Sequence, residues 1–244
     1  MNTRFQWIFG CAAGLLLLHG LAGCGGGGMA SELSAQPEAR PLSRSSGNLL
    51  RLPADDKFSI ALAPAQKAPG INGKAEASAS AERSGVGDAS ARVENGGTAS
   101  ATFQVGHALK NDSNNQLDLV VRTRFNYEYA AGAQPAGETE DATLSLNLYA
   151  RDGKNRLLKT LTVLAHSTAE GDVQSKDRKE AEFTLTLGPG DSVSVFVGGT
   201  VMINTKEGRT ADGSIKLSGL EMDVESKVAP TVMPASAPAG AAVP

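Results

Sequence analysis

Acidic and amide side chains gather in loops between predicted strands, where they could bind calcium. One loop contains Asp112, and another contains Glu138, Glu140 and Asp141. Calcium takes six to eight oxygen ligands from carboxylates, amides and carbonyls, so these carboxylates are the calcium candidates of the chain. Their spacing does not match an EF-hand loop, and polar loops of secreted proteins usually face water. The sequence therefore predicts no metal centre and no cofactor beyond these candidates.

Two aromatic side chains could bind a sugar ring by stacking. Tyr149 and Phe196 have the same parity as the polar residues of their predicted strands, so either could point outward. The alternative for Phe196 is contact with a loop, or with residues 58–62, on the second face of its strand. Met202 shares the parity of Phe196, and together they could form an apolar patch for another envelope protein.

Histidine is too scarce for a catalytic site to be evident. His107 and His166 each end an alternating run, and neither has a metal-ligand partner at suitable spacing. No G-x-S-x-G motif is present, and a nucleophilic serine needs a base and a group that orients it. We expect both histidines to lie at strand ends in contact with solvent. The sequence predicts no catalytic residue and no enzymatic activity.

The N-terminus has the three parts of a bacterial signal sequence. Arg4 is followed by an apolar run over residues 7–18, and Leu21-Ala22-Gly23-Cys24 closes the segment. These four residues resemble the lipobox of bacterial lipoprotein precursors. The resemblance implies cleavage after residue 23, lipid on Cys24, and a membrane as a partner through that lipid. Gly25, which is not Asp, favours the outer membrane. An ordinary secretory signal and a retained membrane helix are the alternatives.

Composition narrows the function further. The chain has 23 basic and 26 acidic side chains, an acidic balance that argues against nucleic acid as a partner. Cleavage would remove Cys11 and Trp7, and lipid would occupy Cys24. The mature protein would then have no disulfide, so its stability would depend on packing alone.

The chain divides into a signal, a spacer, a domain and a tail. Residues 1–23 form the signal, and residues 24–70 are rich in Gly, Ser and Pro, which is typical of a flexible tether. Residues 58–62 alternate and could add an edge strand. Residues 71–227 form the domain, and the uncharged Ala- and Pro-rich residues 228–244 predict a disordered tail.

Period-two alternation dominates residues 71–227, clearest over residues 117–129, and no helical stripe appears. The phase slips at Gly219, which predicts a β-bulge at Ser218-Gly219. Tight turns are expected at Asp152-Gly153, at residues 188–191 and at Asp212-Gly213. Arg122 and Arg124 share a polar face with Asp118 and Glu128, which suggests cross-strand ion pairs.

These patterns predict an all-β fold: a single antiparallel β-sandwich or jelly-roll-like domain of about seven to nine strands. We expect a non-enzymatic, lipid-anchored envelope protein that works through binding or structural contacts. Adhesion, carbohydrate binding and a subunit role in an envelope assembly all fit. The alternative is an envelope glycan-processing enzyme that uses paired carboxylates.

Overall fold

The computed structural model describes residues 39–42, 48–135 and 139–229, and almost all of their regular structure is β-strand. A seven-stranded sheet, sheet A, packs on a six-stranded sheet, sheet B. Sheet A contains β1 (Arg40–Leu42), β3 (Ile60–Leu62), β4 (Ala65–Pro69), β7 (Gly97–Asn111), β9 (Ala142–Asp152), β10 (Leu157–Ser167) and β12 (Ser192–Thr205). Sheet B contains β2 (Asn48–Leu52), β5 (Lys74–Glu82), β6 (Val86–Glu94), β8 (Leu117–Gln134), β11 (Val173–Leu187) and β13 (Thr210–Val228). The all-β sandwich predicted from the alternation is confirmed, but the two sheets contain thirteen strands within the described residues, where seven to nine were expected.

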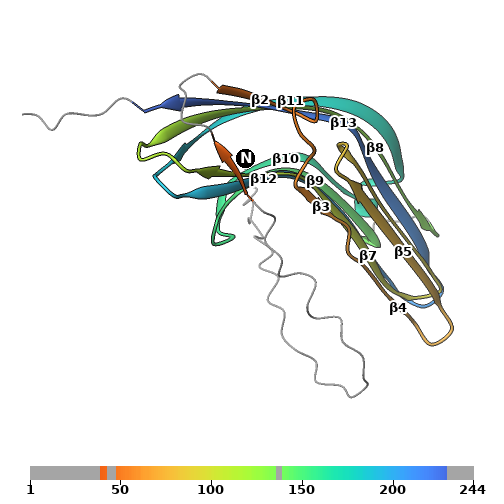
Figure 1. Ribbon diagram of the computed structural model, residues 1–244. Helices are drawn as coiled ribbons and strands as arrows, with labels where there is room; N and C mark the ends of the chain where they lie inside the picture. Colours follow the sequence, from red (N-terminus) through yellow and green to blue (C-terminus); the bar gives the residue numbers. More distant parts are fainter. Residues whose placement is uncertain (1–38, 43–47, 136–138, 230–244) are drawn as a thin grey trace, which may run out of the picture. The chain divides into compact units, whose positions relative to one another are not determined.

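The long strands of the two sheets form two layers (Figure 1), with β8, β11 and β13 in one and β7, β9, β10 and β12 in the other. The strand order is β1-β7-β12-β9-β10 in sheet A and β11-β8-β13-β6-β5 in sheet B. The strand pairs are antiparallel except for β1, which runs parallel to β7. A short 3₁₀ helix, η2 (Thr168–Glu170), connects β10 to β11. Within the described ranges, no helix has the length and hydropathy needed to cross a membrane.

The N-terminal strands extend the domain beyond the predicted boundary at residue 71. β1, β3 and β4 all pair with β7, while β2 pairs with β13. Residues 40–42 and 48–69, which the composition assigned to the tether, therefore belong largely to the sandwich. The edge strand expected within residues 58–62 is confirmed over residues 60–62 as β3. Local composition misses β1, β2 and β4 because their partners lie far along the chain, and because short strands at a sheet edge tolerate proline. The rest of residues 24–70 and nearly all of the predicted tail lie outside the described residues.

The core between the sheets is aliphatic and is organised around Phe103. The Phe103 side chain on β7 is fully buried. A Cβ added to Gly87 on β6 would lie 2.5 Å from the Phe103 ring, and one added to Gly199 on β12 would lie 2.4 Å from it. Since real Cβ atoms do not approach so closely, the two glycines leave the space that the ring fills. Close packing of this kind supplies the stability that the sequence assigned to packing alone.

The bulge predicted in the last strand is confirmed. In β13, Ser218 pairs with Asn126 but Glu221 pairs with Arg124, so two residues stand opposite Phe125. Gly219 has a φ of 60°, which a residue without a Cβ adopts readily. The extra residue turns Leu220 toward the core, where it is fully buried.

The turn predictions are correct in two places and wrong in one. Asp152-Gly153 lies at the β9–β10 turn, and residues 188–191 connect β11 to β12. Asp212-Gly213 instead lies inside β13, paired on both sides with β6 and β8. A Cβ on Gly213 would lie 3.0 Å from Val201 Cγ1, so the residue is small because sheet A packs against it. The turn before β13 is closed by the Arg209 N–H, which donates to the Lys206 carbonyl at 3.2 Å.

Candidate functional site

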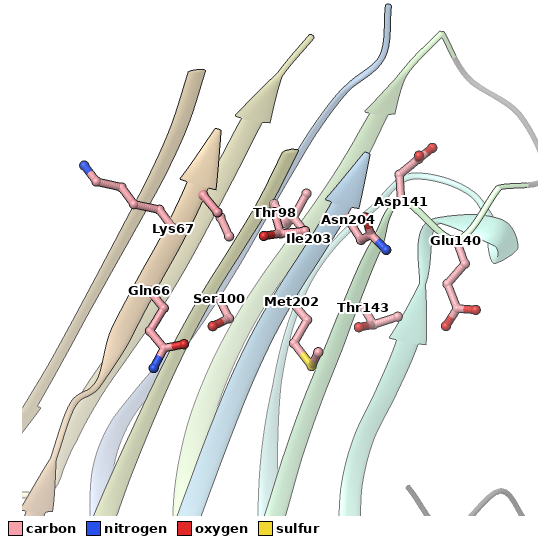
Figure 2. A pocket seen from close by; sticks show the side chains of 12 residues that line it. Gln66, Lys67, Thr98, Ser100, Glu140, Asp141, Thr143, Met202, Ile203 and Asn204 are labelled. Atoms are coloured by element: carbon pink, nitrogen blue, oxygen red, sulfur yellow. The ribbon is translucent and has the colours of Figure 1, made fainter. Parts of the chain in front are cut away.

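A groove crosses the outer face of sheet A and is the best candidate for a binding site. Gln66 pairs with Ser100, Ser100 with Met202, and Met202 with Thr143, so these side chains form a row across β4, β7, β12 and β9. Figure 2 shows this row, with Thr98 and Asn204 in the row beside it. The groove encloses about 530 Å³. Met202 is 48% exposed within it, which offers an apolar contact among hydroxyl and amide groups.

The two rows of outward side chains next to the groove are polar and uncharged. The next row along the strands contains Thr102, Thr200 and Ser145, and the Thr102 hydroxyl lies 3.3 Å from the Thr200 hydroxyl, to which it donates. Gln104, Gly198 and Asn147 form the row after that. We call the outward residues of these rows and of the groove, from β7, β9 and β12, the polar face of sheet A. Charged side chains line the groove only toward its ends, at Lys67 and at Glu140 with Asp141 (Figure 2).

A buried ion pair fixes the loops at one end of the groove. The Asp141 carboxylate, 6% exposed, accepts from Arg209 Nε at 2.8 Å and from the Thr139 hydroxyl at 2.6 Å. The Asp141 backbone N–H donates to the Thr168 hydroxyl, and that hydroxyl donates to the Thr139 carbonyl, both at 3.0 Å. Arg209 lies in the β12–β13 turn and Thr168 in η2. The network therefore holds three connections of the sandwich together.

The same contacts set the charge of Asp141. Burial alone would raise its pKa, but the hydrogen bonds from Arg209 and Thr139 and the nearby positive charge hold the pKa below its usual value. Asp141 is therefore a stable anion whose Oδ2 accepts hydrogen bonds from both Arg209 and Thr139. No local pattern in the sequence indicates Arg209 as a partner of Asp141, because the two residues are 68 positions apart.

The calcium candidates do not meet at one site. Asp112 follows β7 and pairs with Lys110 Nζ at 2.9 Å. Asp141 precedes β9. The whole of strand β8 therefore lies between Asp112 and Asp141 in the sequence. Glu140 is exposed at the groove, and Glu138 lies outside the described residues. Among the residues that the structure describes, no group of three or more His, Cys, Asp or Glu side chains is placed to hold a metal ion.

Tyr149 and Phe196 do come together, but only one of them is accessible. Their ring centroids are 5.2 Å apart on the outer face of sheet A. The Arg151 guanidinium lies 5.6 Å from the Tyr149 centroid and 5.8 Å from that of Phe196. Phe196 is only 5% exposed, which agrees with the alternative of a covered ring on the second face of its strand and contradicts an exposed patch with Met202. Tyr149 is partly exposed and lies over Gly198, where a Cβ would be 3.2 Å from the ring.

The two histidines have different environments. His166 ends β10 as predicted, and its Nε2 lies 3.0 Å from the Gly171 carbonyl oxygen. His107 was expected at a solvated strand end, and this is wrong. It lies within β7, is 2% exposed, and its Nδ1 accepts from the Ser59 N–H at 3.2 Å. The strand continues past it because β1 and β12 both pair with its last residues.

The outer face of sheet B is charged, in contrast to sheet A. Arg122 Nε lies 2.6 Å from Glu182 on β11, and Arg124 Nη2 lies 2.8 Å from Glu221 on β13. The predicted cross-strand ion pairs are confirmed, with partners from the neighbouring strands in place of Asp118 and Glu128. Asp118 instead accepts from the Thr186 hydroxyl at 2.8 Å. These charges largely satisfy one another, which leaves the polar face of sheet A, with its uncharged rows, as the more available surface.

Comparison with known proteins identifies no family. A scan against protein-family models and a search of curated proteins found no match. Structural similarity to an arabinose-bound α-L-arabinofuranosidase, MgGH51, covers 66% of this chain and 23% of that one, at 11% identity and a TM-score of 0.23. The enzymatically active domain of the bacteriophage CBA120 tailspike protein 4 matches at 8% identity and a TM-score of 0.26, over 76% of this chain and 20% of that one.

The CBM22-1 xylan-binding domain from Paenibacillus barcinonensis Xyn10C is also similar, at 11% identity and a TM-score of 0.22, over 77% of this chain and 100% of that domain. Similarities at this level carry no argument about ligand or activity. The function must be inferred from the chemistry of the outer faces.

Proposed function

We propose that this chain is a lipid-anchored protein of the bacterial cell envelope that binds a neutral, hydroxyl-rich glycan on the polar face of sheet A. The observation that carries the proposal is the uncharged middle of the groove, in which Ser100, Met202 and Thr143 lie in one row across the sheet. The lipid anchor rests on Leu21-Ala22-Gly23-Cys24, which lies outside the described residues.

The chemistry of the groove suits a neutral sugar chain. Hydroxyl and amide groups both donate and accept hydrogen bonds, as sugar hydroxyls do, and neither partner has to bury a charge. The polarizable thioether of Met202 can contact the apolar face of a sugar ring. The row continues across β4, β7, β12 and β9, which gives an extended ligand several contacts.

Hydrogen bonds lower the pKa values of four carboxyl groups, of which Asp141 lines the groove. A glycosidase needs one carboxyl group with a raised pKa as its general acid. Hydrogen bonds from Lys176, from Arg209 and from Lys227 lower the pKa values of Glu128, Asp141 and Glu225 respectively. Backbone and side-chain hydrogen bonds from Arg156 do the same for Asp152. Each of these shifts opposes the requirement of a general acid, so none of these four groups suits that role.

Affinity electrophoresis tests the proposed binding. The purified protein is run through native gels that contain a neutral glucan, xylan or mannan, or a polygalacturonate. We expect at least one neutral polysaccharide to retard the protein. Met202→Glu should abolish the retardation, because it places a charge in the groove. Thr184→Glu is the matched control, since Thr184 is an exposed strand residue in sheet B.

Equal retardation of the Met202 and Thr184 variants would place the binding elsewhere on the molecule. Retardation by polygalacturonate alone would rule out a neutral ligand.

A further inference from the structure

The segment from Lys57 to Leu62, which we call the strap, ties the two sheets together. The Phe58 N–H donates to the Arg83 carbonyl in the β5–β6 turn of sheet B, at 3.0 Å. Two positions later the strap enters sheet A, where Ile60 pairs with Gly106 of β7. Phe58 is fully buried, and a Cβ on Gly85 would lie 3.2 Å from its ring. The strap is thus held by both sheets and by a buried aromatic side chain.

A reciprocal contact holds the strap to β7. The Ser59 N–H donates to His107 Nδ1 at 3.2 Å, and the Ala108 N–H donates to the Ser59 hydroxyl at 2.9 Å. Because Nδ1 accepts a hydrogen bond, the closed contact requires the neutral imidazole with its proton on Nε2. Nε2 is buried and has no hydrogen-bond partner in the described part of the chain. A second proton could enter only at Nδ1, where it would face the Ser59 N–H.

The surroundings of His107 oppose its protonation. Burial lowers the pKa of the ring most strongly, and Arg40 lowers it further. Asp56 and the nearby backbone of Lys57 act in the opposite direction, but Asp56 is already paired with Arg40 at 2.9 Å. Along β7 the neighbours on the same face are Val105 and Leu109, and across the sheet Val195 stands opposite. These apolar side chains offer the imidazolium no acceptor, whereas a hydrogen bond with the Lys57 backbone favours the charged ring.

We infer that the contact between Ser59 and His107 is a pH-sensitive latch, and that protonation of His107 releases the strap from β7. Release uncovers the edge of β7 at Gln104–Gly106, with which β3 pairs when the strap is closed. An exposed strand edge accepts another strand, so the opened state would be competent for strand addition. This device is independent of glycan binding on the polar face.

The direction of the pH effect on strap opening follows because the closed strap requires a neutral His107 ring. In the opened strap the ring regains an ordinary pKa of about 6.5. Above about pH 6.5 the free-energy difference that favours the closed strap over the opened strap has its full value. This difference decreases as the pH falls below about 6.5. While the closed state excludes the proton, the opening equilibrium should rise by up to about tenfold for each pH unit.

Amide hydrogen exchange measures this opening directly. The full protein is exchanged between pH 7.5 and 5.0, and rates for Ser59 and Ala108 are corrected for the intrinsic pH dependence of exchange. We expect the corrected rates to rise toward tenfold per unit below about pH 6.5, while the centre of β8 does not respond. Corrected rates that stay constant with pH would overturn the latch.

Two variants separate the titration from the hydrogen bond. His107→Asn places an amide oxygen near the position of Nδ1 and cannot titrate, so its corrected rates should not change with pH. Ser59→Ala loses one of the two hydrogen bonds, so exchange should be faster at every pH with the slope retained. An unchanged slope in the His107→Asn protein would assign the response to another group and refute the latch.

The wild-type protein supplies a further test that needs no variant. The NMR titration of the His107 ring protons should follow the increase in strap exchange over the same pH range. A His107 ring that titrates while the strap stays fully protected would refute the latch.

Discussion

Removal of Arg209 should destabilise the protein strongly, because it would leave the Asp141 carboxylate buried without its cation. The exposed fractions of the two side chains are 19% for Arg209 and 6% for Asp141. Breaking a buried pair by removing one partner costs about 3–5 kcal/mol. The Thr139 hydroxyl, 2.6 Å from the carboxylate, stays in place and favours the lower end of that range. We therefore expect Arg209→Met to lower the free energy of unfolding by about 3 kcal/mol.

Urea denaturation at pH 7 measures this loss, and an exposed pair provides the control. Arg156 and Asp152 form a similar ion pair at 2.6 Å, but Arg156 is 74% exposed. Arg156→Met should cost less than about 1 kcal/mol. In the double variant Asp141→Leu with Arg209→Met no charge is left buried, so much of the lost stability should return.

The pH dependence of the same variant gives a second signature. The pKa of Asp141 is lowered in the folded protein, so its contribution is fully present above an unfolded-state pKa of about 4. That contribution is lost as the pH falls through the lower pKa of the folded state. The difference in the free energy of unfolding between wild type and Arg209→Met should therefore become smaller below about pH 4. If Arg209→Met and Arg156→Met cost the same at pH 7, the assignment of this ion pair as a buried anchor is wrong.

Four further substitutions test the core, the bulge and the anchor. Phe103→Ala should lower the free energy of unfolding by about 3–5 kcal/mol. Gly199→Ala should lower it by about 1–3 kcal/mol, because its Cβ would overlap the Phe103 ring. Both losses are read from thermal melts, and a loss under about 1 kcal/mol for Phe103→Ala would contradict the central place of its ring in the core. Gly219→Val should cost about 1–2 kcal/mol at its positive φ, whereas an unchanged melting temperature would show that the bulge relaxes freely. Cys24→Ser should abolish incorporation of labelled palmitate and release the protein from membranes, and continued labelling of this variant would refute the lipobox.

The alternation of the chain was sufficient to predict the sandwich and the bulge. The inward set of β13 resumes at Leu220 after Gly219, and that phase slip is visible in the sequence itself. The turn at Asp212-Gly213 was mispredicted because the sequence cannot show that Val201 of sheet A packs against Gly213. A glycine that forms a turn cannot be told apart, in a single sequence, from a glycine that leaves room for a packed side chain.

The site was harder to predict than the fold because its residues are joined by pairing and not by spacing. Gln66 on β4 and Thr143 on β9 lie in one row only because β7 and β12 pair with each other and with these two strands. His107 and Ser59 have no local relation, and their contact depends on the strap returning to β7. Phe196 has the parity of an outward residue, and only the structure places Tyr149 and Arg151 against it.

Methyl NMR of the methionines offers the most direct test of glycan binding by sheet A. Met202 lies exposed in the groove, while Met222 is fully buried in the core and serves as an internal control. Protein labelled at the methionine methyl groups is titrated with neutral gluco-, xylo- and manno-oligosaccharides and with oligogalacturonate. We predict a saturable shift of the Met202 methyl with at least one neutral sugar and none at Met222. A Met202 methyl that responds to no neutral sugar, or only to oligogalacturonate, would contradict the proposal.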